Sequence, residues 1–374
     1  MSSGSEYNMP NSSAARRPRR YLGLVIFVII VAVVIGAFAL RSPPPPATAS
    51  LRTSLALLTS NDDAYWNTII TGAQDAARKA DVDLTIVRTR THAIEQSEQL
   101  EYALAHGAHG LAVAVRDPGV EYMVLNKVAG AVPVITLESD APSSARLAFV
   151  GTDNYSAGWA AAEQVREAMP DGGRVIITVG SLDVANARER RQGVIDNLLG
   201  RAFDRDASFD EFTADLVGKK YSIIATVVHQ NDATKATPRL VEAINAHPDI
   251  NCIVGLYGYS APAALRALEQ TNKAGKVKVI GFDDFEETKA GVKNGLVFSS
   301  ILQDNYGCGY RAITLLADAV RHKGSRQPSA PRMIYTGISI LRADGVTPVS
   351  DATQPVEPTT REAMTMPTTM PTTK

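Results

Sequence analysis

Short apolar runs alternate with amphipathic stretches from Leu51 to Leu341, and this alternation restricts the fold more than any other feature of the sequence. Within the runs, apolar side chains occupy consecutive positions, which indicates strands buried on both faces, as in a parallel sheet covered by helices. Strands that alternate with helices predict a doubly wound α/β fold. The runs are too numerous for one comfortable sheet, so we expect two such domains in this chain of 374 residues.

The pattern sets approximate limits for the strands and helices. The predicted strands are Leu55–Thr59, Leu84–Thr89, Gly110–Val115, Pro133–Glu138, Leu147–Gly151, Arg174–Gly180, Ile223–Val228, Cys252–Tyr257, Val277–Phe282, Val297–Leu302 and Arg332–Leu341. The predicted helices include Ala64–Ala80, Glu95–His106, Tyr155–Met169, Arg188–Leu199, Thr234–His247, Pro262–Thr271 and Tyr306–Val320. Open α/β sheets bind ligands at the carboxyl ends of their strands, so a site is expected in the loops that follow these strands.

The amino-terminal region carries a membrane signal. Tyr21–Leu40 contains no charged residue and follows a basic segment, RRPRR, within residues 1–20. As a helix rising about 1.5 Å per residue, this run spans about 30 Å, the hydrocarbon thickness of a bilayer. We expect a transmembrane signal anchor at 21–40, with residues 1–20 as a cytoplasmic basic tail. A cleaved signal peptide is the alternative, because Ala37 and Ala39 offer a small-residue cleavage pattern.

Two low-complexity segments flank the predicted domains. Residues 41–50, which include SPPPPATA, predict a stiff, Pro-rich linker that lifts the folded part off the bilayer. Residues 350–374 are rich in Thr and Pro and lack apolar periodicity, so we expect a disordered tail. The two cysteines, Cys252 and Cys308, lie in a predicted strand and at a predicted helix start. A disulfide between them is allowed in this compartment, but two separately buried thiols are the favoured interpretation.

Charge and motifs exclude several classes of function. A formal net charge of -1 gives no electrostatic basis for binding nucleic acid. The sequence has no dinucleotide-binding glycine loop after the first strand, no phosphate-binding P-loop and no nucleophile elbow. The one close histidine pair, His106 and His109, falls where a helix should end, which favours capping over metal binding. We therefore expect no metal site, no cofactor and no enzymatic activity.

The predicted loops instead carry side chains suited to a hydroxylated ligand. Asp63, Tyr65 and Trp66 follow the first strand, Arg188 opens a helix, and Asp283 follows a later strand. Aromatic rings cover the C–H faces of a sugar, while carboxylates and guanidinium groups bind neighbouring hydroxyls. The alternatives are a core position for the tryptophan, helix N-caps for the two aspartates and a surface position for the arginine.

Seven segments together resemble the ribose-binding type of periplasmic binding protein. They are SLALLTSNDDAYWNTIITGAQDAARKADVDL, VPVITLESD, FVGTDNYSAG, ANARERRQG, INAHPDINCIVGLYGYSAPAALRAL, VKVIGFDDFEE and GLVFSSILQDNYGCG. The resemblance covers about Leu51–Leu341 and implies the type I fold, with two Rossmann-like lobes joined by three crossing hinge strands. It implies discontinuous lobes, with residues 51–153 and 304–332 in the N-terminal lobe and 154–303 and 333–345 in the C-terminal lobe.

The resemblance also implies which residues contact a ligand held between the lobes. By matched position these are Asp63, Tyr65, Trp66, Glu138, Ser139, Arg188, Asn231 (or Gln230), Tyr257, Asp283 and Gln303. Sugar binders of the family commonly carry Asp-Arg where this chain has Glu138 and Ser139, so one forked hydrogen-bond donor is lost. The ligand implied is therefore a sugar or sugar-like molecule, with a different pentose, a hexose, a polyol or another small hydroxylated ligand favoured over ribose.

Two functions follow from this resemblance. The first is an extracytoplasmic (periplasmic) solute-binding protein, anchored to the inner membrane, that delivers a small carbohydrate-like ligand to the permease of an ABC importer. The second is a ligand-sensing ectodomain that signals to a membrane partner such as a sensor kinase or chemoreceptor. A carbohydrate-active enzyme is least favoured, because no pair of carboxylates has a spacing that specifies catalysis.

Overall fold

The computed structural model describes most of the chain from Arg52 onward. The described ranges are 52–90, 92–204, 208–212, 215–322 and 332–349, together with Phe27, Ile29 and Val31. The predicted anchor at 21–40 therefore lies outside the described residues apart from those three, as do the basic tail 1–20, the linker 41–50 and the tail 350–374. In the parts that are described, no helix combines the length and the apolar character needed to cross a bilayer.

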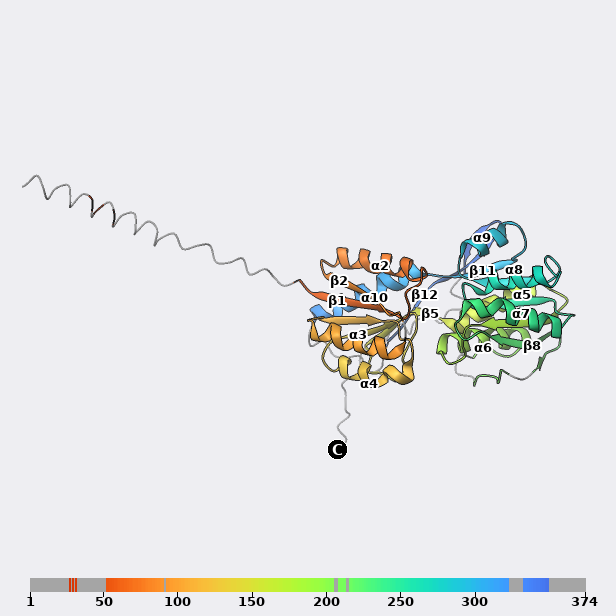
Figure 1. Cartoon of the computed structure of the whole chain (residues 1–374), viewed down its shortest axis with the longest axis horizontal. Coiled ribbons are helices and arrows are strands. Elements are labelled where there is room, and N and C mark those ends of the chain that lie inside the picture. Colours follow the sequence, from red (N-terminus) through yellow and green to blue (C-terminus); the bar gives the residue numbers. More distant parts are fainter. Residues whose placement is uncertain are drawn as a thin grey trace, which may run out of the picture. The chain divides into compact units, whose positions relative to one another are not determined.

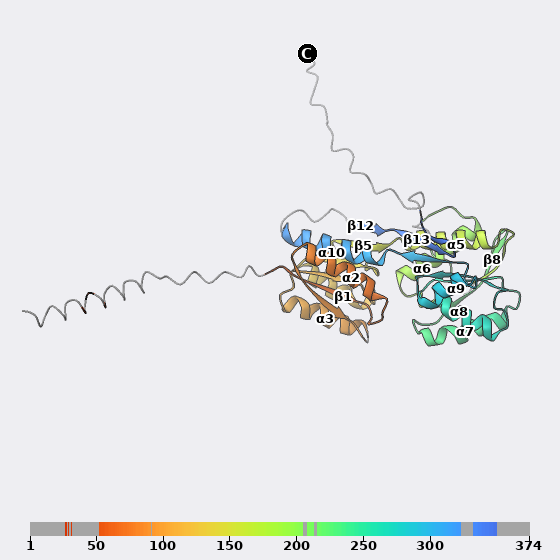
Figure 2. The same cartoon turned by 90° about the horizontal axis from the view of Figure 1, so that it is seen from above.

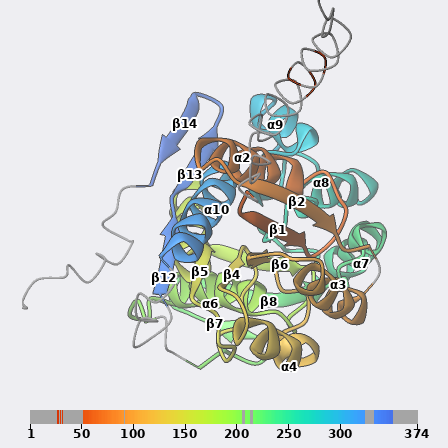
Figure 3. The ribbon, with the colours of Figure 1, turned by 90° about the vertical axis from the view of Figure 1, so that its left-hand side faces the viewer.

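The first sheet has six parallel strands, in the order β12-β5-β4-β3-β1-β2. Figure 1 labels β1, β2, β5 and β12 of this sheet. The strands are β1 (Ser54–Thr59), β2 (Asp83–Arg88), β3 (Gly110–Val113), β4 (Val134–Leu137), β5 (Ala148–Thr152) and β12 (Arg332–Thr336). The helices that cover this sheet are α2 (Trp66–Lys79), α3 (Ala93–Ala105), α4 (Pro118–Ala129) and α10 (Asn305–Arg321). Figure 3 shows α2 and α10 together on one side of β1.

Helices on both faces explain the continuous apolar runs of the first sheet. In β1, Leu55 and Leu57 pack in the core formed with α2 and α10, whereas Ala56 and Leu58 pack in the core formed with α3 and α4. Successive side chains of a strand point to opposite faces. Both faces are covered, so the four central positions of this strand carry apolar side chains.

The second sheet has eight strands, in the order β14-β13-β11-β10-β9-β6-β8-β7. The strands are β6 (Gly173–Val179), β7 (Leu216–Val217), β8 (Tyr221–Val228), β9 (Cys252–Gly255), β10 (Lys278–Phe282), β11 (Ser299–Gln303), β13 (Ile338–Arg342) and β14 (Gly345–Pro348). Its helices are α5 (Asn154–Ala168), α6 (Ala185–Leu199), α7 (Ala233–Ala246), α8 (Ser260–Gln270) and α9 (Glu286–Lys293). The five central strands are parallel, and the antiparallel strands β7, β13 and β14 lie at the two edges.

The chain passes between the two sheets three times (Figure 2). The passages lie at Asp153, between β5 and α5, at Asp304, between β11 and α10, and at Gly337, between β12 and β13. The backbone N–H of Asp304 donates to the carbonyl of Gly337 over 3.1 Å, which joins the second passage to the third. The α/β fold with two lobes, predicted from the sequence, is confirmed.

The carboxyl-terminal strand differs from its sequence-based prediction. Arg332–Leu341 was expected to form one strand, but Gly337 divides it into β12, which pairs with β5 of the first sheet, and β13, which pairs with β11 of the second. The first sheet therefore extends to Thr336, beyond the expected end of its lobe at 332. Which residues move together as lobes stays a prediction.

The two cysteines are buried in different cores. Cys308 of α10 packs between α10 and the first sheet, whereas Cys252 of β9 packs in the second. Neither forms a disulfide. The favoured interpretation of two separately buried thiols is confirmed.

Candidate functional site

A buried arginine, Arg190 of α6, connects the segments that meet near the passages. Its side chain is 3% exposed. Nε donates to Asn154 Oδ1 over 2.8 Å, Nη1 to the carbonyl of Leu256 over 3.0 Å, and Nη2 to Gln303 Oε1 over 2.7 Å. The guanidinium carbon also lies 4.9 Å from the ring centroid of Phe282. Because these partners come from α5, from the end of β9, from β10 and from β11, one side chain holds four segments of the second lobe in register.

Gln303 extends this network toward the first sheet. Its Nε2 donates to Asp283 Oδ1 over 2.8 Å and lies 3.5 Å from the Tyr65 hydroxyl. That hydroxyl donates to Asn305 Oδ1 over 3.1 Å. Tyr65 follows β1 of the first sheet, whereas Asp283 follows β10 of the second. The network therefore brings together three residues that the sequence predicted for the site.

Four residues at the ends of strands have a left-handed backbone. Glu138, Gln230, Asn231 and Asp283 have φ between 57° and 62°, and they are among six such non-glycine residues in the described chain. Side chains with a Cβ rarely adopt this conformation. Such strain gathers at functional sites, where the surrounding structure enforces it, so its recurrence at the predicted positions supports a site there.

Arg190 is the cation that acts on both buried carboxyl groups of this region, Glu138 and Asp283. Burial raises the pKa of Glu138 to about 7, Arg190 opposes the rise, and Asp283 and Asp63 add to it. Burial likewise raises the pKa of Asp283, and Arg190 again opposes the rise. Burial also holds the pKa of Tyr65 well above its ordinary value, and the two nearby carboxylates reinforce the effect. Acceptors thus outnumber cations in this region, which suits a ligand rich in hydroxyl donors.

Tyr257 and Asn231 lie together over Gly180, directly after β6. A Cβ on this glycine would stand 2.1 Å from Cε2 of Tyr257 and 2.3 Å from Oδ1 of Asn231, so no larger residue fits. The backbone N–H of Asn231 also donates to the Gly180 carbonyl over 3.0 Å. Burial raises the pKa of the Tyr257 phenol to about 12. The phenol therefore stays protonated, able both to donate and to accept a hydrogen bond.

The loop after β1 orders itself through Asp63 and Asn61. Asp63 is exposed, and its Oδ1 accepts the backbone N–H of Tyr65 over 3.0 Å. Tyr65 is the N-cap residue of α2, and Phe285 is the N-cap residue of α9. Neither Asp63 nor Asp283 is therefore the N-cap residue of its helix, although the Asp63 carboxylate accepts a backbone N–H at the start of α2.

Trp66 takes the core position that was its alternative. Its side chain is 1% exposed and packs between α2 and the first sheet. The indole Nε1 donates to Asn61 Oδ1 over 2.8 Å, and its ring meets the Tyr65 ring edge-on with centroids 5.6 Å apart. The structure does not bring Trp66 among the polar groups of the site, because the ring anchors the loop from beneath.

Arg188 contacts a different part of the chain from Arg190. Its guanidinium carbon stands 5.5 Å from the ring centroid of Phe209, and its Nε is buried with no hydrogen-bond partner among the residues that the structure describes. The neighbouring Arg190, which the sequence analysis did not single out, is the cation that acts on Glu138 and Asp283. A helix turns about 200° in two residues, so the two arginines face opposite ways.

Ser139 contributes through its backbone. Its N–H donates to the Leu137 carbonyl over 2.6 Å, and its own carbonyl accepts the Val115 N–H over 3.2 Å. These bonds turn the chain sharply after β4 and hold the preceding Glu138 in its left-handed conformation.

In the described part of the chain, no three His, Cys, Asp or Glu side chains are arranged to hold a metal ion.

A pocket of about 600 Å³ lies beside the second and third passages between the sheets. It is lined by Leu302, Gln303, Asp304, Gly337, Ile338, Ser339, Pro348 and Val349. It shares Gln303 with the polar network but includes neither Glu138 nor Asp283. This pocket therefore borders the region of the buried carboxyl groups at Gln303 but does not contain those groups.

Comparison with known proteins agrees with this architecture. The sequence profile described as "Periplasmic binding protein domain" matches residues 55–324. The ribose import binding protein RbsB of Salmonella typhimurium is 25% identical over 275 residues, which span 73% of this chain and 86% of that protein. The D-allose-binding periplasmic protein of Escherichia coli is 25% identical over 173 residues, 46% of this chain and 50% of that protein.

Two solved structures have the same fold. One is an ABC transporter solute-binding protein from Burkholderia graminis in complex with D-arabinose, with a TM-score of 0.69, 25% identity, and coverage of 78% of this chain and 95% of that chain. The other is GanP, a glucose-galactose binding protein from Geobacillus stearothermophilus, with a TM-score of 0.68, 26% identity, and coverage of 78% and 98%. The chain belongs to the periplasmic binding protein family, in its type I class. Its relatives are solute-binding proteins, and it is not an enzyme.

Proposed function

We propose that this protein is an extracytoplasmic solute-binding protein that captures a small sugar or sugar-like ligand between its two lobes and delivers it to an ABC importer. The observation that carries the proposal is the polar network from Arg190 through Gln303 to Asp283 and Tyr65. This network ends at strand termini of both sheets, where type I binding proteins close on their ligand. Closure would shift an open–closed equilibrium by bending at the three passages.

The residues proposed to contact the ligand supply acceptors and rings in excess of cations. They are Asp63, Tyr65, Glu138, Ser139, Arg188, Asn231, Tyr257, Asp283 and Gln303. Hydrogen bonds to charged groups contribute about 1.5–3 kcal/mol each. Three or four of them supply the roughly 8 kcal/mol of micromolar binding. Related proteins are described as binding ribose, D-allose, D-arabinose and glucose or galactose, so the class of ligand proposed is a neutral pentose, hexose or polyol.

The tether is part of the proposal. The uncharged run Tyr21–Leu40 after a basic segment supports an inner-membrane anchor with the binding lobes on the periplasmic side. One of the named relatives is a ribose import binding protein, which favours delivery to a permease over the sensing alternative.

A thermal-shift measurement on the full-length protein tests ligand binding. D-ribose, D-arabinose, D-galactose, D-allose and myo-inositol are added separately at millimolar concentration. A ligand at 100 times its Kd contributes about 2.7 kcal/mol and raises Tm by roughly 5 °C or more. The matched variant is Asp283→Asn, expected to lose the ligand-induced rise with little change in Tm without ligand. No shift with any of the five compounds, or an equal loss of stability without ligand, contradicts the proposal.

A fractionation experiment tests the tether. The full-length protein is expected to remain with membranes after washing in high salt, because hydrophobic insertion of a spanning helix is insensitive to ionic strength. The mature amino terminus is sequenced from the same sample. A terminus near Leu40 would show cleavage of the segment and contradict the anchor.

A further inference from the structure

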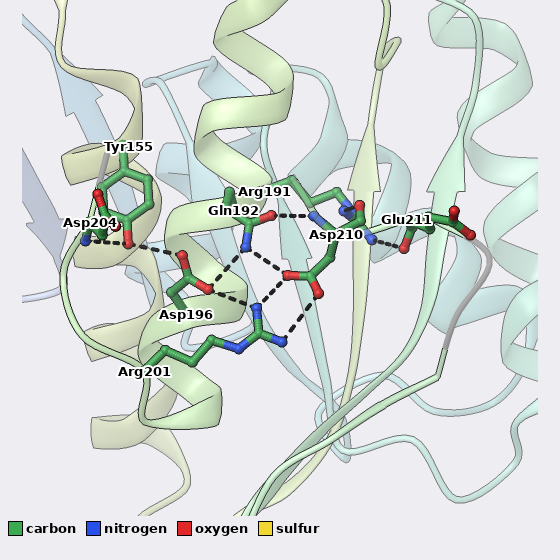
Figure 4. A network of polar contacts seen from close by, with 8 residues as sticks. All are labelled: Tyr155, Arg191, Gln192, Asp196, Arg201, Asp204, Asp210 and Glu211. Carbon is green, nitrogen blue, oxygen red and sulfur yellow. Dashed lines mark hydrogen bonds and ion pairs between the residues drawn. The ribbon is translucent and has the colours of Figure 1, made fainter. Parts of the chain in front are cut away.

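The segment Ser208–Phe212, which follows α6, is fastened along that helix by its backbone (Figure 4). Arg191 donates from Nη1 to the carbonyl of Asp210 over 2.6 Å and from Nη2 to the carbonyl of Glu211 over 2.9 Å. Gln192 accepts the backbone N–H of Asp210 at Oε1 over 2.8 Å and donates from Nε2 to its carboxylate over 2.7 Å. Two adjacent side chains of the helix therefore fix two consecutive residues of the segment.

A second set of contacts secures the Asp210 side chain. Arg201 forms ion pairs with Asp210 and with Asp196, and Gln192 also donates to Asp196 over 2.9 Å. The hydroxyl of Tyr155 in α5 donates to the other oxygen of Asp196 over 3.0 Å. Asp196 is 2% exposed, so the network reaches from the protein interior to the surface segment. Networks whose members are all hydrogen-bonded make a structure rigid.

This fastening places the Phe209 ring over Arg188. Positions 188, 192 and 196 are spaced by four residues and share one face of α6. The segment runs along that face, and the Arg188 guanidinium carbon lies 5.5 Å from the Phe209 ring centroid. Arg188 stands in the first turn of α6, close to the carboxyl end of β6, which is the ligand-facing end of a parallel strand.

One hydrogen-bond donor of the Arg188 guanidinium, its Nε–H, is buried and unpaired in the described part of the chain. Buried donors are normally paired, so each exception calls for an explanation. A cation held on an aromatic face keeps its N–H groups in the plane of the guanidinium, pointing away from the ring. The ring thus fixes the guanidinium and leaves its edge available to an acceptor.

We propose that Phe209 is a positioning residue for ligand binding: its ring holds Arg188 so that the guanidinium donates from Nε to an oxygen of the bound sugar. This inference rests on the proposed function, because it assigns the missing partner of Nε to the ligand. It adds a segment outside the strand-end loops to the determinants of affinity. Phe209 itself is 44% exposed. Its ring therefore acts through its contact with Arg188 and not by packing in a core.

The first test needs no ligand. Full-length protein is labelled with ¹⁵N-arginine, and the Nε–H resonance of Arg188 is assigned from Arg188→Lys. The ring current of Phe209 is expected to displace this resonance, Phe209→Leu to remove the displacement, and Phe209→Tyr to restore it. A wild-type resonance that Phe209→Leu leaves unchanged overturns the proposal.

The second test measures affinity. Kd is determined calorimetrically for D-ribose and D-arabinose with the wild type, Phe209→Leu and Phe209→Tyr. A lost cation–π contact predicts a Kd about two- to tenfold higher for Phe209→Leu and a near-normal Kd for Phe209→Tyr. Phe212→Leu, at a residue of the same segment that is 55% exposed, is the control and should leave Kd unchanged.

The two tests separate the possible failures. An unchanged Kd in Phe209→Leu, with binding by the wild type, overturns the positioning role and leaves the proposed function intact. If the wild type binds neither sugar, the proposed function fails for these ligands and the ligand part of the inference falls with it. The arginine resonance still decides whether Phe209 holds the guanidinium.

Discussion

The α2–α10 pair over the first sheet and the α5–α6 pair over the second both cross at a glycine, but the side chains around the two crossings differ in polarity. In each pair, a glycine of one helix lies against the backbone of the other. A Cβ on Gly309 of α10 would stand 1.9 Å from the Ile69 carbonyl oxygen of α2, and a Cβ on Gly158 of α5 would stand 1.9 Å from the Arg190 carbonyl oxygen of α6. Both pairs therefore approach closely enough to exclude any side chain at the crossing.

The side chains around the two crossings differ. The first interior is apolar, with Trp66, Ile69, Ala73, Ala312, Ile313 and Leu316. The second contains buried polar and charged groups, including Arg190, Arg191, Gln192, Asp196 and Asn197. Buried polar groups are kept where they find partners, and those of α6 find them in β11 and in the segment after the helix. The difference teaches that the first helix pair packs mainly through apolar side chains, while the second also fixes, through Arg190, segments that we propose to meet the ligand.

Substitution at the crossings is expected to have the largest effect. Gly158→Val and Gly309→Val should each lower the free energy of unfolding by about 4 kcal/mol or more, because a side chain there overlaps backbone atoms that cannot move aside. Urea denaturation of the two variants measures this. Gly130→Val, after α4, is the control, since the nearest atom to its Cβ is 3.4 Å away. Tolerance at only one crossing would break the similarity between the pairs.

Substitution of Arg190 should cost more stability than a substitution in the apolar interior of the α2–α10 pair. Arg190→Met leaves the acceptors of Asn154, Leu256 and Gln303 without their donor and should destabilise the protein by about 3–5 kcal/mol. Ile313→Val in the apolar interior should cost only about 1 kcal/mol. Denaturation at neutral pH compares them, with Arg52→Met at a side chain that is 59% exposed as control. Equal effects of the first two variants would contradict the distinction.

The pH dependence of stability should expose the buried carboxyl Glu138. Its pKa rises from 4.5 to about 7 on folding, so the folded state binds the proton more tightly than the unfolded state. The penalty is absent below pH 4.5, grows between pH 4.5 and 7, and is complete above pH 7. Glu138→Gln should therefore stabilise the protein by about 2 kcal/mol more at pH 8 than at pH 5.

Thermal unfolding of the wild type and Glu138→Gln from pH 5 to 8 measures this difference. Glu98→Gln, at an exposed residue of α3, serves as the control. A Tm difference between wild type and Glu138→Gln that does not change with pH would show that the carboxyl is ionised at no cost.

The smallest effect concerns the hydroxyl that links the first sheet to the network. Tyr65→Phe removes the hydrogen bond to Asn305 and should cost about 1 kcal/mol of stability, with a modest rise in Kd for D-ribose or D-arabinose. Tyr102→Phe, at a residue that is 64% exposed, is the control. A larger loss than that of Arg190→Met would reverse the roles assigned to the two lobes.

Much of the fold is predictable because buried strands leave a strong mark on the sequence. The runs around Leu55, Val134 and Val254 are almost entirely apolar, since helices cover both faces of each sheet. Other elements were missed for identifiable reasons. The α4 helix begins with Pro118, which suggests a break, yet proline is favoured in the first helical turn when a residue such as Asp117 caps it. Gly337 lies within an apolar run whose two halves belong to different sheets.

The site was predictable in part. Glu138 and Asp283 follow strands directly and Tyr257 lies two residues beyond β9, so the strand limits place all three at the carboxyl edge. Trp66 and Arg190 were not predictable, because an aromatic or an arginine near a helix start fits either the interior or a ligand. Only the rotation of α2 and α6 against their sheets decides between these, and that rotation depends on tertiary packing.

Because the first sheet is discontinuous in the sequence, the two sheets are completed in a fixed order during translation. Strands β6 to β11 are contiguous in the chain, whereas the first sheet receives α10 and β12 only after all of them. A ribosome working from the amino end therefore releases a complete parallel core for the carboxyl half first. The amino-terminal strands and helices are translated first, but the apolar face of α2 stays uncovered until α10 has been synthesised. A product terminated before α10 would expose that face to quality-control proteases.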